Sequence, residues 1–366
     1  MNLLSFKIFK AKLSQISKIL DKPLVIFNLD GLNQNYKMFT LLEDHSSPAI
    51  LAILPGGKAH LLVSSIETAL PAALSELLTI HAYDSNKGIF EILNEIIPLK
   101  KEIFVEISTK YSLFDTLTYG FVKKLKKVYK PVSAESILWE LRTIKTNEEI
   151  ALIKKAINLT YEILNEIESH IKIGVSEEII MDGLNLLVNK YKLSFSFKPI
   201  IAAGTRAFDP HPIRATKRKL KKNDLLILDL GLYYNCYTSD ITRTYKIDGD
   251  ISDINFFGIN EEMENKLISL KLSDITPYDL GMIMDDIAIK HGVHSLEKHG
   301  YGHGIGVAIH DVYPSIPMVN KKNKKPNLPK FSENMVFAFE PGFYTKRNSF
   351  RIENNYVIKN GYAVKL

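Results

Sequence analysis

This sequence has almost no cysteine and tryptophan, and it has no long apolar run. Its 366 residues include one cysteine, Cys236, and one tryptophan. A single cysteine excludes both an internal disulfide framework and a structural zinc site built from several cysteines. The best apolar run, Ala49 to Leu54, stops at Pro55 and is too short to cross a membrane. We therefore expect no membrane association.

The first residues also differ from a secretion signal. Met1 to Leu20 place lysines within an apolar stripe, which is the pattern of an amphipathic helix. A secretion signal would have a continuous hydrophobic centre and a cleavage site with small residues. Together with the single cysteine, this pattern leads us to expect a cytoplasmic protein.

The composition is that of an ordinary globular protein with a moderate positive charge. Hydrophobic residues make up 46% and charged residues 24%, and the net charge is +6. Lysines cluster at 217–222 and at 321–325, as they would in a phosphate-binding patch. Both segments are polar and contain or adjoin proline or asparagine, so we interpret them as solvated loops and expect no nucleic-acid partner.

The amino-terminal part alternates short apolar runs with helical segments, which predicts an α/β domain. The expected strands are Leu24–Phe27, Ile50–Leu54, His60–Val63 and Ile103–Ile107. The expected helices cover Gly88–Ile97 and Phe114–Leu125. Pro131-Val132-Ser133 marks a candidate boundary, so we predict one domain over 1–132 and a second over 133–366.

The second part begins with clear helix signals. Thr146 and Glu149 form a capping box ahead of a helical apolar pattern, and Gly174 is a candidate stop. A second helix is predicted over Glu177–Tyr191 and a third from Thr276-Pro277 to Gly292. The remaining segments have the pattern of hairpin strands. The second domain is therefore predicted to be α+β.

Two aspartates in one of these strand segments have an unusual spacing. If Tyr234-Asn235 is a two-residue hairpin loop, Asp229 lies directly opposite Asp240. Like charges that face each other destabilise a sheet, and an unpaired buried carboxylate is costly. The pair therefore predicts a cation between the two side chains.

Three further residues complete a candidate ligand set. These are His303, Glu340 and Glu353. The two glutamates fit a second hairpin whose loop is centred on Lys346-Arg347, and Pro341 favours an edge or a bulge beside Glu340. Four carboxylates and one imidazole suit two hard or borderline divalent ions, such as Mn, Co or Zn.

The order Asp, Asp, His, Glu, Glu and its surroundings resemble the M24 metallopeptidases. Within these it is similar to the proline-specific branch, Xaa-Pro dipeptidase (prolidase) and Xaa-Pro aminopeptidase. The resemblance covers about Ile137 to Leu366 and rests on SDITRT (Ser239–Thr244), GHGIG (Gly302–Gly306), EPGFY (Glu340–Tyr344), RIE (Arg351–Glu353) and the upstream LRTIKTNEEIALIKKA (Leu141–Ala156). It implies a pita-bread catalytic domain of the creatinase/aminopeptidase type after a smaller, creatinase-like α/β domain, and a homodimer.

The resemblance also implies roles for the five ligands. Asp229 would bind one metal, His303 and Glu340 the other, and Asp240 and Glu353 would bridge both. A water between the two metals, deprotonated with help from Glu340 as general base, would attack the carbonyl carbon before a proline in short peptides.

Further residues receive implied roles around the substrate. His310 would contact the substrate near the scissile bond and stabilise the tetrahedral intermediate; the alternative is a histidine at the rim with no role. His211 would contact substrate or move a proton, and His299 would line the pocket or support the ligands. Arg351 shares a strand face with Glu353, so it would lie beside the metal carboxylates or the substrate; the alternative is a structural salt bridge. Tyr344 is a candidate for the wall that holds the proline ring.

Two more expectations concern the surroundings of the ligands. Gly302, Gly304 and Gly306 would let the backbone approach the metals and a bound peptide. Arg243 would pair with the carboxylate cluster.

Several alternatives remain open from the sequence. Dipeptidase and aminopeptidase use the same five ligands, and we favour the dipeptidase. Methionine aminopeptidase is disfavoured by the additional amino-terminal domain and by SDITRT. A non-catalytic scaffold with this fold is the alternative from another class, and it is disfavoured because all five positions hold residues that can bind a metal.

Overall fold

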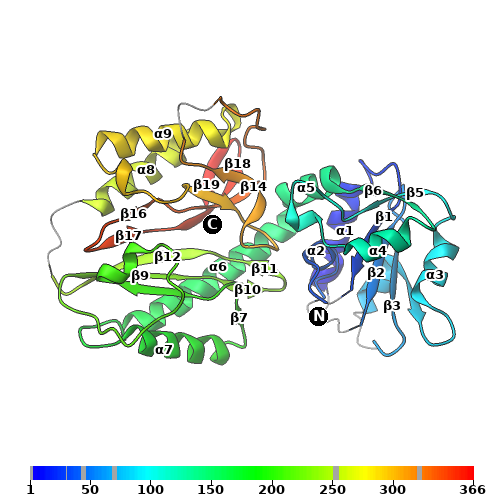
Figure 1. The fold of residues 1–366 in the computed structure, drawn as a ribbon, viewed down its shortest axis with the longest axis horizontal. Helices are drawn as coiled ribbons and strands as arrows, with labels where there is room; N and C mark the ends of the chain where they lie inside the picture. The colour runs from blue at the N-terminus through cyan, green and yellow to red at the C-terminus, as the bar shows by residue number, and fades with distance from the viewer. Residues whose placement is uncertain (1–2, 30, 43–46, 68–71, 250–254, 320–323) are drawn as a thin grey trace. The chain divides into compact units, whose positions relative to one another are not determined.

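The computed structural model describes residues 3–29, 31–42, 47–67, 72–249, 255–319 and 324–366 (Figure 1). These divide into two compact units, one of residues 1–142 with 146–149 and one of residues 143–145 with 150–366. The boundary predicted at 132/133 falls at a strand of the first unit, and the limits of independently folding domains stay a prediction. Among the described residues, no helix is both long and apolar enough to span a bilayer.

The first unit is built on a mixed sheet with the strand order β4-β3-β2-β1-β5-β6. Its strands are β1 (Leu24–Asn28), β2 (Ala49–Ile53), β3 (Ala59–Ser64), β4 (Leu78–Tyr83), β5 (Glu102–Val105) and β6 (Lys130–Ser133). Its helices are α1 (Leu3–Ile16), α2 (Gln34–Thr40), α3 (Ile89–Ile96), α4 (Tyr119–Leu125) and α5 (Glu135–Thr143), with 3-10 turns η1 (Ala72–Glu76) and η2 (Ser112–Phe114).

The sequence predicts part of this α/β unit, because it misses β4, β6, α2 and α5 and starts one helix too early. All four expected strands are present, and the central β1 is buried along its whole length. The helix expected from Phe114 begins at Tyr119 instead. Thr118 explains the later start, because its side chain caps the helix by accepting a bond from the Phe121 amide.

The helices described in the second unit are α6 (Asn147–Glu168), α7 (Glu177–Lys190), α8 (Phe256–Ser269) and α9 (Pro277–Lys290), with short turns η3 (Gly204–Phe208), η4 (Leu272–Asp274) and η5 (His294–Leu296). Of these, α6, α7 and α9 begin where the sequence predicts, and α8 was not predicted. Thr146 and Glu149 exchange the two bonds of a capping box, and so do Thr276 and Asp279. The helix α6 ends at Glu168, before the stop expected at Gly174.

The strands of the second unit pair antiparallel in four small sheets, with the orders β11-β10-β7, β12-β9-β8, β14-β13-β15-β18-β19 and β16-β17. The first strands are β7 (Ser194–Phe195), β8 (Ile200–Ala203), β9 (Asp224–Leu230), β10 (Leu232–Tyr234), β11 (Tyr237–Thr238) and β12 (Ile241–Ile247). The later ones are β13 (Gly302–Gly304), β14 (Asp311–Ile316), β15 (Val336–Phe339), β16 (Gly342–Tyr344), β17 (Ser349–Arg351), β18 (Asn354–Lys359) and β19 (Tyr362–Lys365). In Figure 1, α8 and α9 (yellow) and α7 (green) flank these strands on opposite sides.

The first hairpin has a different register from the predicted one. The turn is Asn235-Cys236, and both residues have positive φ, 47° and 69°. This geometry fits a type I′ turn, which asparagine accepts far more readily than the tyrosine of the predicted loop. Asp229 therefore pairs with Thr242 and not with Asp240. Thr242 lies two residues after Asp240, and side chains two positions apart on a strand share a face. Both aspartates therefore still face the same side of the sheet.

The second hairpin has the predicted register. Tyr344 pairs with Ser349, and the same alignment continues in the pairing of Phe339 with Asn354. Glu340 and Glu353 lie in the breaks between these paired segments, so they are opposite each other, as expected. Pro341 occupies the same break, outside the ladder.

Candidate metal centre

Five side chains from different strands meet in the second unit. Asp229 lies in β9, Asp240 directly before β12, and His303 in β13. Their ligand atoms form two groups, Asp229–Asp240–Glu353 and His303–Glu340–Glu353. Within each group, all ligand atoms lie within 4.8 Å of one another. The five residues predicted from the sequence are therefore brought together by the fold.

The spacing within the cluster is too wide for hydrogen bonds and suits a shared ion. His303 Nε2 lies 3.5 Å from Asp240 Oδ2, 3.7 Å from Glu340 Oε1 and 3.8 Å from Glu353 Oε1. Two ligands that each lie ~2.1 Å from one tetrahedral ion are about 3.4 Å apart. The imidazole is also oriented correctly, since its Nδ1 lies 3.1 Å from the Gly304 carbonyl oxygen and leaves Nε2 for a metal.

Buried carboxylate oxygens without partners are the strongest sign that this cluster binds a cation. Asp229 Oδ1, Asp240 Oδ1 and Glu353 Oε1 are buried and have no hydrogen-bond donor. Buried polar atoms are almost always paired, and a buried anion without compensation is very costly. The residues therefore fit divalent metal ions, which would supply the missing charge.

The pKa values follow from the same crowding. Burial, then the neighbouring Glu353, raises the pKa of Asp240 well above its usual value. Burial, followed by the charge of Glu340, raises the pKa of Glu353 well above its usual value. Burial also raises the pKa of Glu340, to about 8. Burial lowers the pKa of His303 to about 3, so its imidazole is neutral and free to bind a metal.

Two residues that the sequence reasoning missed hold the ligands in place. Thr242 Oγ1 donates to Glu353 Oε2 at 2.9 Å. Asn355 clamps the backbone of Asp240, since its Oδ1 accepts from the Asp240 amide and its Nδ2 donates to the carbonyl oxygen. Thr242 belongs to the quoted motif SDITRT, and Asn355 shares a strand face with Glu353, so alternation along the strand was the available signal.

Arg351 is an ion-pair partner of a ligand. It is 1% exposed, and its Nη2 donates to Asp229 Oδ2 at 2.6 Å. Its other nitrogens donate to the Thr242 and Tyr344 side chains and to the Pro210 carbonyl oxygen. This pair with Asp229 fits both a cation beside the carboxylates and a structural salt bridge, and contact with a substrate stays a prediction.

A chain of hydrogen bonds continues from Arg351 to the pocket wall. The Tyr344 hydroxyl accepts from Arg351 and lies 2.6 Å from His299 Nε2. Burial lowers the pKa of His299 to about 4, so His299 accepts this bond as a neutral ring. Tyr344 itself is 2% exposed and lies behind the wall, so the expectation that it contacts the substrate is wrong.

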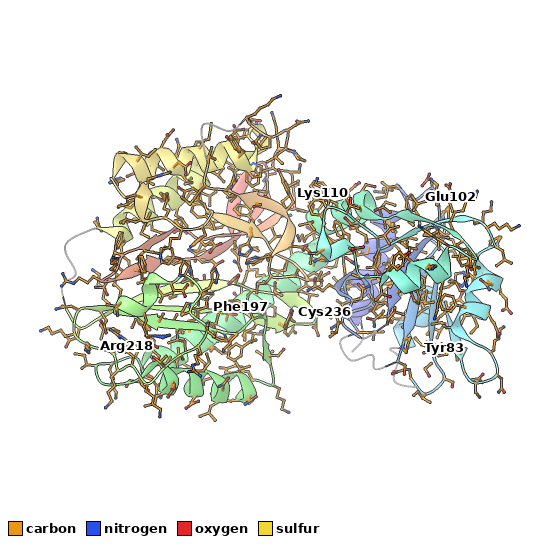
Figure 2. All side chains as sticks on the ribbon, in the orientation of Figure 1. Tyr83, Glu102, Lys110, Phe197, Arg218 and Cys236 are labelled. Carbon is orange, nitrogen blue, oxygen red and sulfur yellow. The ribbon has the colours of Figure 1, made fainter. Side chains whose placement is uncertain are left out.

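The cluster opens into a cavity of about 680 Å³. Its lining includes His211, His299 and His310, which the sequence predicts, and Phe197, which it does not. Phe197 is labelled in Figure 2. The ring centre of His310 lies 4.0 Å from that of His303, and partial burial lowers the pKa of His310. A volume of this order is typical of small-ligand sites.

The surroundings of the cluster sharpen one expectation and correct another. A Cβ on Gly302 would lie 2.1 Å from the Ala338 carbonyl oxygen, and one on Gly304 would lie 2.5 Å from that of Tyr313. Close backbone packing of neighbouring strands therefore requires both glycines, and Gly302 also lines the cavity, so the approach of metals or a peptide stays a prediction. Arg243 bonds the carbonyl oxygen of Glu353 and the side chains of Asn354 and Tyr161, so it does not pair with the carboxylates.

Residues 151–360 match the profile of metallopeptidase family M24. The chain belongs to this family. It is 28% identical over 321 residues to the Xaa-Pro dipeptidase of Pyrococcus furiosus, a match that covers 86% of both chains. The predictions of the family, of a metal-dependent peptidase and of an α+β pita-bread domain behind a smaller domain are confirmed.

Solved structures of the family share the fold along nearly the whole chain. The prolidase from Pyrococcus furiosus is 25% identical with a TM-score of 0.75, covering 96% of this chain and 98% of its own. An X-Pro aminopeptidase from Thermotoga maritima is 24% identical with a TM-score of 0.77, covering 98% of this chain and 96% of its own. The likeness therefore includes the amino-terminal unit, in which no sequence motif of the family was found.

Proposed function

We propose that this protein hydrolyses the peptide bond before proline and acts as an Xaa-Pro dipeptidase with two divalent metal ions. The observation that carries the proposal is the pair of overlapping ligand groups, Asp229–Asp240–Glu353 and His303–Glu340–Glu353. Both contain Glu353, and Asp240 Oδ2 lies 3.5 Å from His303 Nε2 as well. This sharing supports Asp240 and Glu353 as bridges, with Asp229 on one ion and His303 and Glu340 on the other.

The two ions, when bound, would acidify a water and stabilise the oxyanion of the tetrahedral intermediate. Among the carboxylates, Glu340 is the one most open to the cavity, since its side chain is 19% exposed and that of Glu353 only 2%. Glu340 is therefore best placed to take up the proton of the attacking water. His310 lines the cavity, and burial lowers its pKa; we propose that it donates an N–H to the carbonyl oxygen of the scissile bond.

The cavity also supports a substrate with a ring at its amide nitrogen. Phe197, Ile200, Ile309 and Ile316 give it an apolar part beside the histidines. Apolar and histidine side chains accept a proline ring, which offers no N–H to be bonded. His211, on the exposed loop after η3, lines the same cavity and is placed to contact the peptide or to move a proton.

The preference for a dipeptide rests on the relatives. The relative matched over most of both chains is an Xaa-Pro dipeptidase, whereas a structural neighbour is an X-Pro aminopeptidase. The test is hydrolysis of Ala-Pro, Ala-Pro-Ala and Ala-Ala by the full chain after chelation and reloading with Mn or Co. We expect cleavage of Ala-Pro only.

Each alternative outcome has its own meaning. Cleavage of the tripeptide at a comparable rate would contradict the dipeptidase and favour the aminopeptidase. Equal cleavage of Ala-Ala would contradict proline specificity. The absence of any metal-activated turnover would contradict the enzyme itself. The choice of metal, the homodimer and the cytoplasmic location stay predictions.

A further inference from the structure

A second group of potential metal ligands lies outside the catalytic cluster. Asp285 of α9, His294 of η5 and Glu297 each offer a ligand atom, and these atoms lie within 4.8 Å of one another. His294 Nε2 is 3.6 Å from Asp285 Oδ1, a separation again too long for a hydrogen bond and suited to a common ion. The group thus combines one imidazole with two carboxylates.

Glu297 provides a second, independent observation. It is 8% exposed, and both of its carboxylate oxygens are buried without a hydrogen-bond partner. The nearby Tyr301 hydroxyl has a single proton, which it donates to Asp285 Oδ1 at 2.8 Å. A buried carboxylate with neither oxygen paired is rare and very unfavourable unless it is protonated or bound to a cation.

The described groups around Glu297 add negative charge that is not balanced by nearby cations. Asp285 is fully buried, and its Oδ2 accepts from the Val319 amide. Burial, followed by the charge of Asp285, raises the pKa of Glu297 to about 8. Among the described residues, Asp285 forms an ion pair with His294, and Glu297 forms none. Two buried carboxylates therefore face one partly exposed imidazole.

We propose that Asp285, His294 and Glu297 form a second binding site for a divalent transition-metal ion, separate from the catalytic pair. One nitrogen and two carboxylate ligands suit Zn²⁺ and Co²⁺, and solvent completes the coordination. His294, whose side chain is 36% exposed, gives the ion access from water.

The site has a structural consequence for the cavity. Glu297 lies two residues before His299, which lines the cavity, and its segment leads into β13 with His303. An ion held between α9 and this segment would fix the position of both histidines. The role is that of a positioning site, with no contact to the substrate.

The test uses the full chain with a disrupted catalytic cluster, in the double variant Asp240→Ala/Glu353→Ala, which removes a member from each ligand group of that cluster. After chelation, the protein is titrated with Co²⁺ by visible absorption and reloaded with Zn²⁺ for elemental analysis. We expect one bound ion per chain in this background. Adding Glu297→Gln should remove it or weaken binding more than tenfold, because even a group that only supports a ligand changes affinity about 10–100-fold.

A matched surface variant controls for loss of a histidine. His291 lies three residues before His294 and pairs with the exposed Glu262, which also binds Lys290. In the same background, His294→Ala should weaken Co²⁺ binding and His291→Ala should not, and circular dichroism verifies that each variant is folded. No bound ion in the background, or an unchanged stoichiometry in Glu297→Gln, would overturn the proposal. Neither outcome depends on peptidase activity.

Discussion

Both units bury carboxylates, but they compensate them in opposite ways. In the first unit, Glu106 is fully buried and accepts bonds from the side chains of Asn33 and Asn35 and from the Phe27 amide. In the second unit, Asp229, Asp240 and Glu353 each keep one buried oxygen without a donor. A carboxylate with a full set of donors is a structural element, whereas orphaned oxygens mark a place where the fold needs a cation.

The sharpest test of this contrast removes a proposed bridge. Asp240→Ala should abolish metal binding at the catalytic cluster and leave only the ion of the Asp285–His294–Glu297 site. Activity should be lost as well, with kcat/KM for Ala-Pro lowered by more than about 1000-fold, because both catalytic ions lose a ligand. Elemental analysis and steady-state kinetics measure the two effects. The matched control is Asp274→Ala. Ser273–Thr276 repeats the letters SDIT of Ser239–Thr242, but the Asp274 side chain is exposed and lies outside the cluster. Turnover retained in Asp240→Ala would refute the bridging assignment.

The second test concerns the structural carboxylate and its pH dependence. Burial raises the pKa of Glu106 to about 7 from an ordinary 4.5. Between these values the folded state keeps a proton that the unfolded state has lost, so stability is full below pH 4.5 and falls as the pH rises to 7. The expected loss is about 3 kcal/mol, and it should disappear in Glu106→Gln.

Urea unfolding of the full chain at several pH values measures this loss. Trp139, the single tryptophan, lies in α5 of the first unit and reports its unfolding by fluorescence. The control Glu102→Gln changes an exposed residue of β5, the strand that Glu106 directly follows, and should keep the pH slope. An unchanged slope in Glu106→Gln would contradict the raised pKa.

The third test weakens a ligand without removing it. Thr242→Val deletes the hydroxyl that donates to Glu353 and accepts from Arg351. We expect metal affinity to fall about 10–100-fold, as for other groups that orient ligands. Thr244→Val is the matched control, because the Thr244 hydroxyl bonds only the backbone of Arg351. Equal losses in the two variants, measured by Co²⁺ titration, would show that general destabilisation is the cause.

The smallest effect is expected at the pocket wall. Tyr344→Phe removes the hydroxyl between Arg351 and His299. His299 loses its donor, so KM for Ala-Pro should rise a few-fold, in keeping with about 1 kcal/mol for one hydrogen bond. The value of kcat should change little. A large fall in kcat with unchanged KM would instead indicate that Tyr344 supports the metal cluster through Arg351.

Much of the fold and of the ligand set was predictable, and the errors have physical causes. Capping residues predicted the starts of α6 and α9, and strand alternation placed Glu340 opposite Glu353. The register of the first hairpin was wrong because the turn depends on which residues accept positive φ, a preference that the strand pattern does not contain. Thr242 and Asn355 were missed because their role depends on contacts between separate strands.

The sequence by itself determined the class of fold, the five candidate ligands and the family to which the chain belongs. These follow from local signals, such as caps, apolar periodicity and short motifs. Only the tertiary structure decided that Arg351 is committed to Asp229, that Tyr344 lies behind the wall, and that Glu297 meets Asp285 and His294. The reason is that pairing and burial are properties of residues far apart in the chain, and the cost of an unpaired buried charge becomes visible only when all neighbours are in place.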